Sequence, residues 1–459
     1  MTKKIHIYAF DMNCVSHINH GLWTHPRDQS TSYTSLEYWA NLARTAERGK
    51  LDGIFLADIV GVYDVYKGSP ATAIATGAQT PVNDPLLVVP VMAYVTQHLG
   101  FGVTVNTTYE PPYLLARRLS TLDHLTNGRV GWNIVTGYLD SAARAMGFSE
   151  QPDHDHRYDV ADEYMEVLYK LWEGSWDSDA VVRDRTSGRY ADPDKVRAIK
   201  HRGQHYQLDA IHLSEPSLQR TPVLYQAGSS TRGRKFAAEH AECAFIGGNK
   251  PEAAASIVSD IRQRAVANGR SADAVKLFTS LSVVVGRTEA EAEEKLEDYR
   301  RHAITEAALA HYSSSIGIDL ARYDLDEPIV YQKTNANNSA LEAITTRSPD
   351  KIWTRREIVD QMVLGSRQKP VVGTPQQIAD HMQAWIDIGD IDGFNLPRTV
   401  APESLEDFVD LVVPILQERG MFKADYSEGT LREKLFGSGH AHLPANHPGS
   451  RFRHPAANP

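Results

Sequence analysis

The sequence predicts an α/β chain folded as a (β/α)8 TIM barrel, and three observations carry that prediction. Eight short apolar segments with the composition of buried strands begin near residues 5, 53, 101, 130, 223, 243, 276 and 393. Segments with helical periodicity separate most of them, and this alternation is typical of a parallel sheet. The chain has 459 residues, a length that barrels with insertions reach as one domain.

The amino-terminal half predicts four strand–helix pairs. Strands are expected at 5–10, 53–57, 101–106 and 130–135, and helices after Thr34, at 86–99, 112–126 and 154–176. Thr34 and Glu37 form a capping-box pattern ahead of the first helix. The fourth helix has an acidic first turn, which suits the positive end of the helix dipole. Residues 154–158 at the start of this segment form a polar cluster, which is expected to precede the amphipathic part of the helix.

The carboxyl-terminal half continues the alternation with two interruptions. Strands are expected at 222–227, 243–246, 276–286 and 393–397, and helices from 251, at 354–365, at 374–388 and after Ser404. Thr374 and Gln377 form a second capping box. Residues 177–222 and 300–353 predict irregular insertions on a single barrel domain that spans residues 1–436. The tail, residues 437–459, lacks periodicity and is expected to be disordered or to lie on a neighbouring chain.

Composition predicts a soluble cytoplasmic enzyme. The net charge of −10 disfavours nucleic acid or an anionic membrane as a partner. Cys14 and Cys243 are too few and too distant in sequence to suggest a disulfide framework, which favours a reducing compartment. No signal peptide and no apolar run of about 20 residues, the length of a membrane span, is found.

Polar residues at the carboxyl ends of barrel strands predict the active site, because barrel enzymes build their sites there. The candidates at strand ends and in adjoining loops are His17, Asp58, Asn106, Asn133, Thr136, His154, Tyr158, Ser229 and Ser230. Taken singly, each of them is also compatible with a helix cap or a satisfied turn. Their convergence on one rim favours a site.

The segment Gly228–Arg234 predicts a phosphate site. A strand ends, a glycine permits close approach, and a helix begins with hydroxyls and two arginines, Arg232 and Arg234. Backbone amides, the helix dipole and cationic side chains would all favour a phosphate. An ordinary serine cap remains the alternative. The sequence contains no nucleotide-triphosphate loop and no dinucleotide fingerprint, and neither HDH (154–156) nor HRGQH (201–205) predicts a metal site.

Five stretches resemble the bacterial-luciferase superfamily, and within it the two-component flavin monooxygenases. They are ERGKLDGIFLAD (47–58), YEPPYLLARRLSTLDHLTNGRVGWNIVT (109–136), HDHRYDVADEYMEVLYKLW (154–172), QAGSSTRGRKFAAEHAE (226–242) and GDIDGFNL (389–396). The resemblance implies a luciferase-type barrel that binds FMN in its reduced form, FMNH2. The residues that it assigns to flavin are Asp58, Thr104, Asn106, Asn133, His154, Tyr158, Gly228, Ser229 and Ser230. It places His17 near the substrate, and either His17 or Tyr158 would supply a proton.

The same resemblance implies partners and a reaction. A separate NAD(P)H-dependent flavin reductase would deliver the reduced flavin, O2 would be the co-substrate, and the oxygenase would be a dimer or tetramer. Further similarity at 10–17, 57–69 and 81–85 implies a small organosulfur substrate, with dimethyl sulfide first. Sulfones, amines and aminopolycarboxylates remain alternative substrates. A flavin- or deazaflavin-binding barrel without oxygenase activity and a flavin-free hydrolase remain alternative functions.

Overall fold

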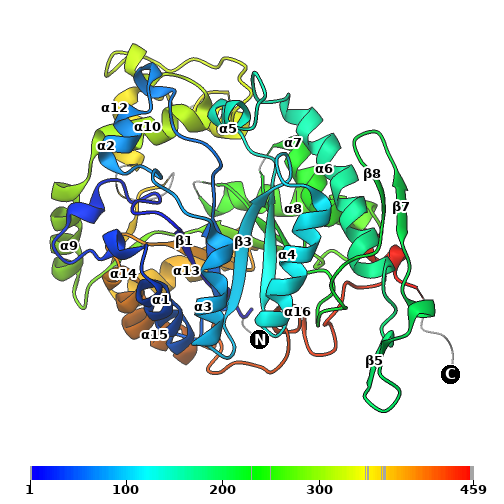
Figure 1. Cartoon of the computed structure of the whole chain (residues 1–459). Helices are drawn as coiled ribbons and strands as arrows, with labels where there is room; N and C mark the ends of the chain where they lie inside the picture. Colours follow the sequence, from blue (N-terminus) through cyan, green and yellow to red (C-terminus); the bar gives the residue numbers. More distant parts are fainter. Residues whose placement is uncertain are drawn as a thin grey trace.

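The barrel is the organising element of the fold. The computed structural model describes residues 3–228, 230–248, 250–346, 348, 351–362, 364 and 368–454. Eight parallel strands close in the order β1–β14–β11–β10–β9–β4–β3–β2, which confirms the predicted fold class (Figure 1). They are β1 (His6–Met12), β2 (Gly53–Ala57), β3 (Gly100–Asn106), β4 (Val130–Val135), β9 (Val223–Ala227), β10 (Cys243–Phe245), β11 (Lys276–Ser280) and β14 (Gly393–Pro397).

Helices surround the barrel and cover the outward faces of its strands. They are α1 (Leu36–Arg48), α3 (Val89–Tyr94), α4 (Pro112–Leu125), α6 (His154–Tyr169), α7 (Thr231–His240), α8 (Pro251–Ala267), α13 (Pro375–Gly389) and α15 (Val413–Glu418). Alternate strand residues such as Val103, Val105, Trp132 and Ile134 pack in the core between strands and helices. Because side chains alternate along a strand, the residues between them, Thr104 among these, face the barrel interior.

Aromatic rings fill the barrel interior. Tyr8, Phe55, Tyr225 and Phe278 belong to one buried cluster, and the hydroxyls of Tyr8 and Tyr225 lie 2.8 Å apart. A Cβ atom at Gly131 would lie 2.3 Å from the ring of Tyr225. A glycine in the neighbouring strand therefore makes room for an interior ring.

The carboxyl-terminal segment closes the amino-terminal end of the barrel. Leu431 and Leu435 of α16 (Leu431–Phe436) join the interior aromatic cluster. The tail continues over the same chain, where the His447 Nε2 atom lies 2.9 Å from the carbonyl oxygen of His240. Arg453 reaches the buried carboxylate of Glu173 at 2.7 Å. The segment 437–454 is thus packed on its own barrel.

Short helices cap the opposite end, above the carboxyl ends of the strands (Figure 1). They are α2 (Ala71–Thr76), α5 (Asp140–Ala145), α10 (Thr305–Ile316), α11 (Asn338–Ala343) and α12 (Arg355–Met362). Their apolar side chains form a separate buried cluster. The insertion predicted at 300–353 is therefore not irregular throughout, because it contains α10 and α11. The helix α10 is buried on most of its faces. Its sequence, TEAALAHYSSSI, therefore lacks the alternation of a polar and an apolar face by which an amphipathic helix is recognised.

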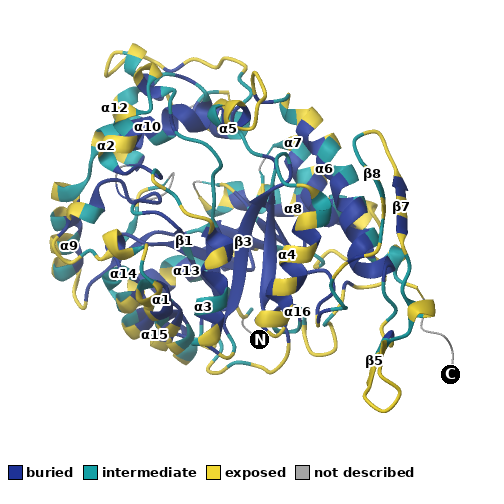
Figure 2. Cartoon of the chain, in the orientation of Figure 1, coloured by how far each residue is buried: buried dark blue, intermediate teal, exposed yellow. Residues whose placement is uncertain are grey.

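Residues 177–222 contain two antiparallel hairpins that the sequence did not predict. They are β5 (Val181–Asp184) with β6 (Arg189–Ala191), and β7 (Ile199–Arg202) with β8 (Gln207–Ala210). Figure 2 shows that much of this segment is exposed, unlike the barrel strands. An exposed two-stranded ribbon needs no continuous apolar run, so the buried-strand signal is missing.

Two further helix predictions are corrected by hydrogen bonds between side chains and the backbone. The helix predicted at 86–99 is only the 3-10 turn Pro85–Leu87 followed by α3. The Glu47 carboxylate accepts the backbone N–H groups of residues 97–99 at 2.7–3.1 Å, which draws that stretch out of the helix. The polar cluster at 154–158 lies inside α6, because Asp153 caps that helix.

Three other boundaries also differ from the prediction. Ser35, not Thr34, caps α1, whereas the capping box at Thr374 and Gln377 is confirmed. The stretch 276–286 splits into β11 and β12 (Val283–Val285), and β12 leaves the barrel to pair with β13 (Val371–Gly373). Ser404 lies within α14 (Glu403–Asp407) and accepts the N–H of Thr399 instead of capping a helix. The helix α9 (Glu289–His302) follows β12.

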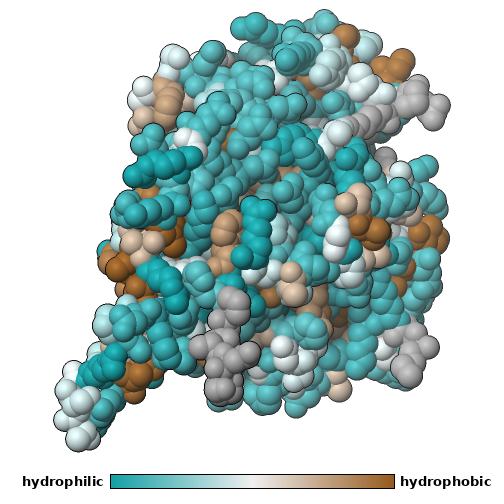
Figure 3. All heavy atoms as spheres, turned by 90° about the vertical axis from the view of Figure 1, so that its right-hand side faces the viewer, coloured by the Kyte–Doolittle hydropathy of each residue, from teal (hydrophilic) through white to brown (hydrophobic). Residues whose placement is uncertain are grey.

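The face on the right of Figure 1 is predominantly hydrophilic, with small apolar patches (Figure 3). The segment around β5 projects from the body of the molecule (Figures 1 and 3). In the described part of the chain, no helix combines the length and apolar character needed to cross a bilayer.

Candidate active site

Polar side chains on β3 and β4 meet a backbone carbonyl of β2 inside the carboxyl end of the barrel. The Asn133 amide donates to the Thr104 hydroxyl at 2.9 Å, and that hydroxyl donates to the carbonyl oxygen of Leu56 at 2.8 Å. Both side chains are buried. The Oδ1 atom of Asn133 is buried without a partner among the described residues. A buried acceptor in that position can take a hydrogen bond from a bound ligand or from water.

Asn106 ends β3 beside these residues. Its Oδ1 atom accepts the backbone N–H of Thr108 at 2.7 Å. A Cβ at Gly137 would lie 2.5 Å from the Asn106 amide nitrogen, and Gly137 has a φ of 71°, so two constraints require glycine there. The loop after β4 is thus fitted closely against Asn106.

Asp58 follows β2 at the same rim and is partly buried. Burial raises the pKa of its carboxyl group to about 8, and the nearby carboxylates of Asp84 and Glu110 contribute in the same direction. At neutral pH this carboxyl group is mostly protonated, so it can donate a hydrogen bond.

The start of α7 forms a second part of the rim. Ser230 caps the helix by accepting the N–H of Gly233 at 3.0 Å. The other N–H groups of the first turn have no partner within the helix, because no turn precedes them. The Gln226 amide donates to the Tyr158 hydroxyl at 3.3 Å. A Cβ at Gly228 would lie 2.4 Å from the Gln226 amide nitrogen and 2.9 Å from the Tyr158 oxygen. Only a glycine fits this cradle without displacing its neighbours.

The two arginines of this segment are already paired with acids. Arg232 bonds Asp159 at 2.9 Å and Asp162 at 2.6 Å, and Arg234 lies 2.8 Å from Asp260. A phosphate bound here would therefore depend on amides and hydroxyls more than on the cations that the sequence suggested. Ser229 lies outside the described residues.

His154 belongs to the same group by position. Its ring lies 5.3 Å from the ring of Tyr158, and its Nδ1 atom lies 2.7 Å from the Asp155 carboxylate. Burial raises the pKa of the Tyr158 hydroxyl, so this group stays protonated at neutral pH. Tyr158 can therefore act as a hydrogen-bond donor as well as an acceptor.

His17 lies in the loop after β1. Its ring stands edge-on to Phe10 at 4.5 Å, and its carbonyl oxygen accepts the Gln79 amide at 2.6 Å. Burial lowers the pKa of His17 to about 3, and the positive charge of Arg398 acts in the same direction. His17 is thus neutral at physiological pH.

A polar network connects this loop with the cap, and the sequence interpretation missed all of its other members. The Tyr63 hydroxyl donates to Gln79 at 2.6 Å and lies 3.1 Å from the Tyr138 hydroxyl. The Tyr63 ring stacks on His311 of α10 at 5.0 Å and 13°. The His311 Nδ1 atom lies 3.0 Å from the Nε2 atom of His20. No motif marks these residues, because loops distant in sequence bring them together.

Gln226 had a detectable signal. It is the one strongly polar residue in the otherwise apolar stretch PVLYQA, it is buried, and it lies one position before the strand ends. A buried amide in a barrel strand needs partners, and near the carboxyl end those partners belong to a site.

The histidines in the two pairs tested for metal binding have other contacts. His201 lies 3.0 Å from Glu163, and the rings of His156 and His205 lie 5.5 Å apart. Two other groups in the described part of the chain could hold a metal: His25, Asp298 and His302, and Asp162, Glu239 and His240. In the first group, the Nδ1 atom of His25 accepts the N–H of Arg27, so the ring proton is on Nε2. This Nε2–H donates to Asp298, and the nitrogen therefore has no lone pair for a metal ion.

Known proteins of one family resemble this chain over nearly its whole length. The model of the luciferase-like monooxygenase family matches residues 18–390. The long-chain alkane monooxygenase of Geobacillus thermodenitrificans is 50% identical over 100% of both chains. The dimethyl-sulfide monooxygenase of Hyphomicrobium sulfonivorans is 48% identical over 99% of this chain and 94% of its own length. A solved riboflavin lyase with modified FMN and riboflavin superposes with a TM-score of 0.92 at 38% identity, covering 99% of this chain and 100% of that chain.

Proposed function

The chain belongs to the luciferase-like monooxygenase family and is a flavin-dependent monooxygenase, and from this premise we propose that its flavin is reduced FMN. Two observations support the fit. The cradle at Gly228 and the start of α7 offers amides and hydroxyls at a helix amino terminus, where a phosphate is favoured. The unpartnered Asn133 Oδ1 atom offers an acceptor for an N–H group of the flavin ring.

The residues divide the binding between the two parts of the rim. Gly228, Ser229 and Ser230 hold the phosphate, while Asp58, Thr104, Asn106 and Asn133 hold the ring system, and His154 and Tyr158 lie between them. Bound reduced flavin supplies the electrons that activate O2. The chain orients the flavin and the substrate, and the cap of α2, α5, α10, α11 and α12 excludes water from the mouth.

Hydrogen-bond donation falls to groups that are neutral at physiological pH. His17 has a pKa of about 3 and Tyr158 keeps its hydroxyl proton, so neither carries a charge. Each can donate a hydrogen bond to an oxygen or sulfur atom within reach. We assign this role to His17 on the substrate side and to Tyr158 on the flavin side.

We further propose that a separate NAD(P)H-dependent reductase delivers the flavin and that the oxygenase is a homo-oligomer, a dimer or a tetramer. The resemblance to two-component oxygenases supports both. Cys14 and Cys243 are buried free thiols, which suits the reducing cytoplasm expected from the sequence.

For the substrate we propose a small organosulfur compound, with dimethyl sulfide first, cleaved to methanethiol and formaldehyde. The observation that carries this proposal is the polar network of Tyr63, Gln79, Tyr138 and His311 under the cap. A sulfur atom can accept a hydrogen bond from such groups, whereas an alkane cannot. A long-chain alkane is the second candidate, since the alkane monooxygenase is 50% identical to this chain.

A coupled assay tests the proposal. Purified protein, FMN, NADH and an added flavin reductase are incubated with dimethyl sulfide or hexadecane, and the products are followed by chromatography of headspace and extract. Loss of dimethyl sulfide with equimolar methanethiol supports the proposal, and hexadecanol favours the second candidate. Peroxide as the only product with either compound would contradict both substrates, and NADH oxidation without the reductase would contradict the partner.

A further inference from the structure

His20 and His311 form a buried imidazole pair between the loop after β1 and the cap. The His20 Nε2 atom lies 3.0 Å from the His311 Nδ1 atom. His20 has no exposed surface, and its own Nδ1 atom is buried without a partner among the described residues. The loop also packs closely on Ile304, the residue before α10: the His20 carbonyl oxygen accepts the N–H of Ile304 at 2.9 Å, and a Cβ at Gly21 would lie 2.4 Å from the Ile304 side chain.

The contact between the two rings requires one proton between the facing nitrogens. Two bare nitrogens at this distance would repel each other, and two N–H groups would clash. If His311 donated, neutral His20 would carry its proton on Nδ1, which would be a buried N–H group without an acceptor. If His20 donates, its Nδ1 atom is only a bare acceptor. Orphaned buried N–H groups are rarer in proteins than under-satisfied acceptors. A doubly protonated His20 is disfavoured, because burial lowers its pKa to about 4.

We propose that His20 is a positioning residue: by donating its Nε2 proton to His311 Nδ1, it fixes His311 as the Nε2–H tautomer and aims that N–H at the substrate. Stacking on Tyr63 holds the plane of the His311 ring, and because Nδ1 faces His20, the other ring nitrogen, Nε2, points away from His20. His311 is partly exposed while His20 is fully buried. This inference deepens the proposed function, on which only the substrate-directed role rests; the tautomer rests on geometry alone.

The first test needs no variant of His20 and no turnover. Nitrogen NMR of the flavin-free protein labelled with ¹⁵N-histidine, with His311 assigned from the signal lost in His311→Gln, reports which ring nitrogen bears the proton. We expect an unprotonated Nδ1 and a protonated Nε2 on His311. A proton on His311 Nδ1 would overturn the proposal whether or not dimethyl sulfide is the substrate.

The second test uses two variants of His20 and a matched control. Glutamine can keep an N–H donor near the position of Nε2, whereas leucine cannot. In His20→Leu we expect product formed per O2 consumed to fall about tenfold, the value of one hydrogen bond, with FMN affinity unchanged. His20→Gln should restore most of this yield. His25→Leu removes another buried histidine of the same loop and should leave the yield unchanged.

The outcomes separate the claims. Equal losses of yield in the glutamine and leucine variants of His20, with FMN bound normally, would overturn the positioning role. If neither variant folds, the wild-type NMR signal still decides the tautomer. If the wild type forms no product from any substrate tested, the proposed function fails, and the NMR result still decides the geometry.

Discussion

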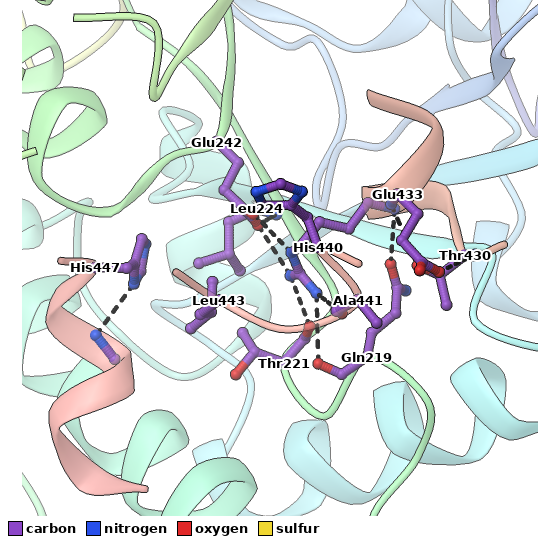
Figure 4. A network of polar contacts seen from close by, with 12 residues as sticks. Gln219, Thr221, Leu224, Glu242, Thr430, Glu433, His440, Ala441, Leu443 and His447 are labelled. Atoms are coloured by element: carbon purple, nitrogen blue, oxygen red, sulfur yellow. Dashed lines mark hydrogen bonds and ion pairs between the residues drawn. The ribbon is translucent and has the colours of Figure 1, made fainter. Parts of the chain in front are cut away.

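Arg432 and Glu242 form an ion pair with both side chains buried at the amino-terminal end of the barrel. The Arg432 Nε atom lies 2.7 Å from one carboxylate oxygen and Nη2 lies 3.0 Å from the other. The remaining guanidinium hydrogens reach the carbonyl oxygens of Gln219, Thr221 and Ala441, and Figure 4 shows these partners gathered around one point. Arg432 belongs to α16, Glu242 directly precedes β10, and Ala441 belongs to the tail. The pair thus connects these three parts of the chain.

Arg432→Met should destabilise the fold by about 3–5 kcal/mol, because it leaves the Glu242 carboxylate buried without its counter-charge. Urea unfolding followed by tryptophan fluorescence measures the change. The control is Arg356→Met, which removes an exposed pair with Asp326 and should have little effect. Equal unfolding midpoints for the two variants would contradict this account.

Ser230→Ala should weaken FMN binding by about 1–2 kcal/mol, the contribution of a hydrogen bond to a charged group. The serine also caps α7, so the variant loses helix stability as well. Ser35→Ala removes the cap of α1, far from the rim, and serves as the control. Flavin titration should separate the two variants, while their thermal stabilities fall together. A Ser230→Ala variant with wild-type affinity would exclude the serine from the phosphate site.

Asn133→Ala should lower FMN affinity by about 1–2 kcal/mol, since it removes the acceptor assigned to the flavin ring. It also removes the donor to Thr104. Thr104→Val removes the acceptor of that bond while leaving the Asn133 oxygen in place, and it should affect affinity less. Flavin titration by fluorescence quenching measures both. A larger loss in Thr104→Val than in Asn133→Ala would assign the effect to the Thr104 hydroxyl instead.

Much of the barrel was predictable because strand burial and helix periodicity are local signals. All eight strands were expected at their observed places. The strand-end rule pointed to Asn106 and Asn133, and the family resemblance added Thr104. The capping box at Thr374 was read correctly because the donor and acceptor lie three residues apart. Short-range hydrogen bonds of this kind leave their pattern in the sequence.

The parts that escaped prediction depend on contacts between distant residues. Glu47 shortens α3 from 50 residues away, and His20 meets His311 across 291 residues. The helix α10 is covered by other cap elements, so its sequence shows no apolar stripe. Tertiary burial, not local propensity, therefore determines the cap and the substrate side of the candidate site.

The stability of the protein should fall as the pH rises from about 4 to about 8 because of Asp58. The folded-state pKa of this carboxyl is about 8, against about 3.9 in an unfolded chain. Between these values the folded state holds a proton that the unfolded state has lost, so raising the pH favours unfolding.

Asp58→Asn removes the titration and should flatten that part of the pH profile. The variant should gain stability over the wild type on going from pH 4 to pH 8, by on the order of a few kcal/mol at about 1.4 kcal/mol per pKa unit. Asp326→Asn is the control. Arg356 lowers the pKa of Asp326, so its stabilising contribution is present above pH 4 and is lost on acidification. Urea midpoints across the pH range give both curves. A constant difference between wild type and Asp58→Asn over this range would mean that Asp58 is ionised throughout, and its role as a hydrogen-bond donor to the flavin would then be untenable.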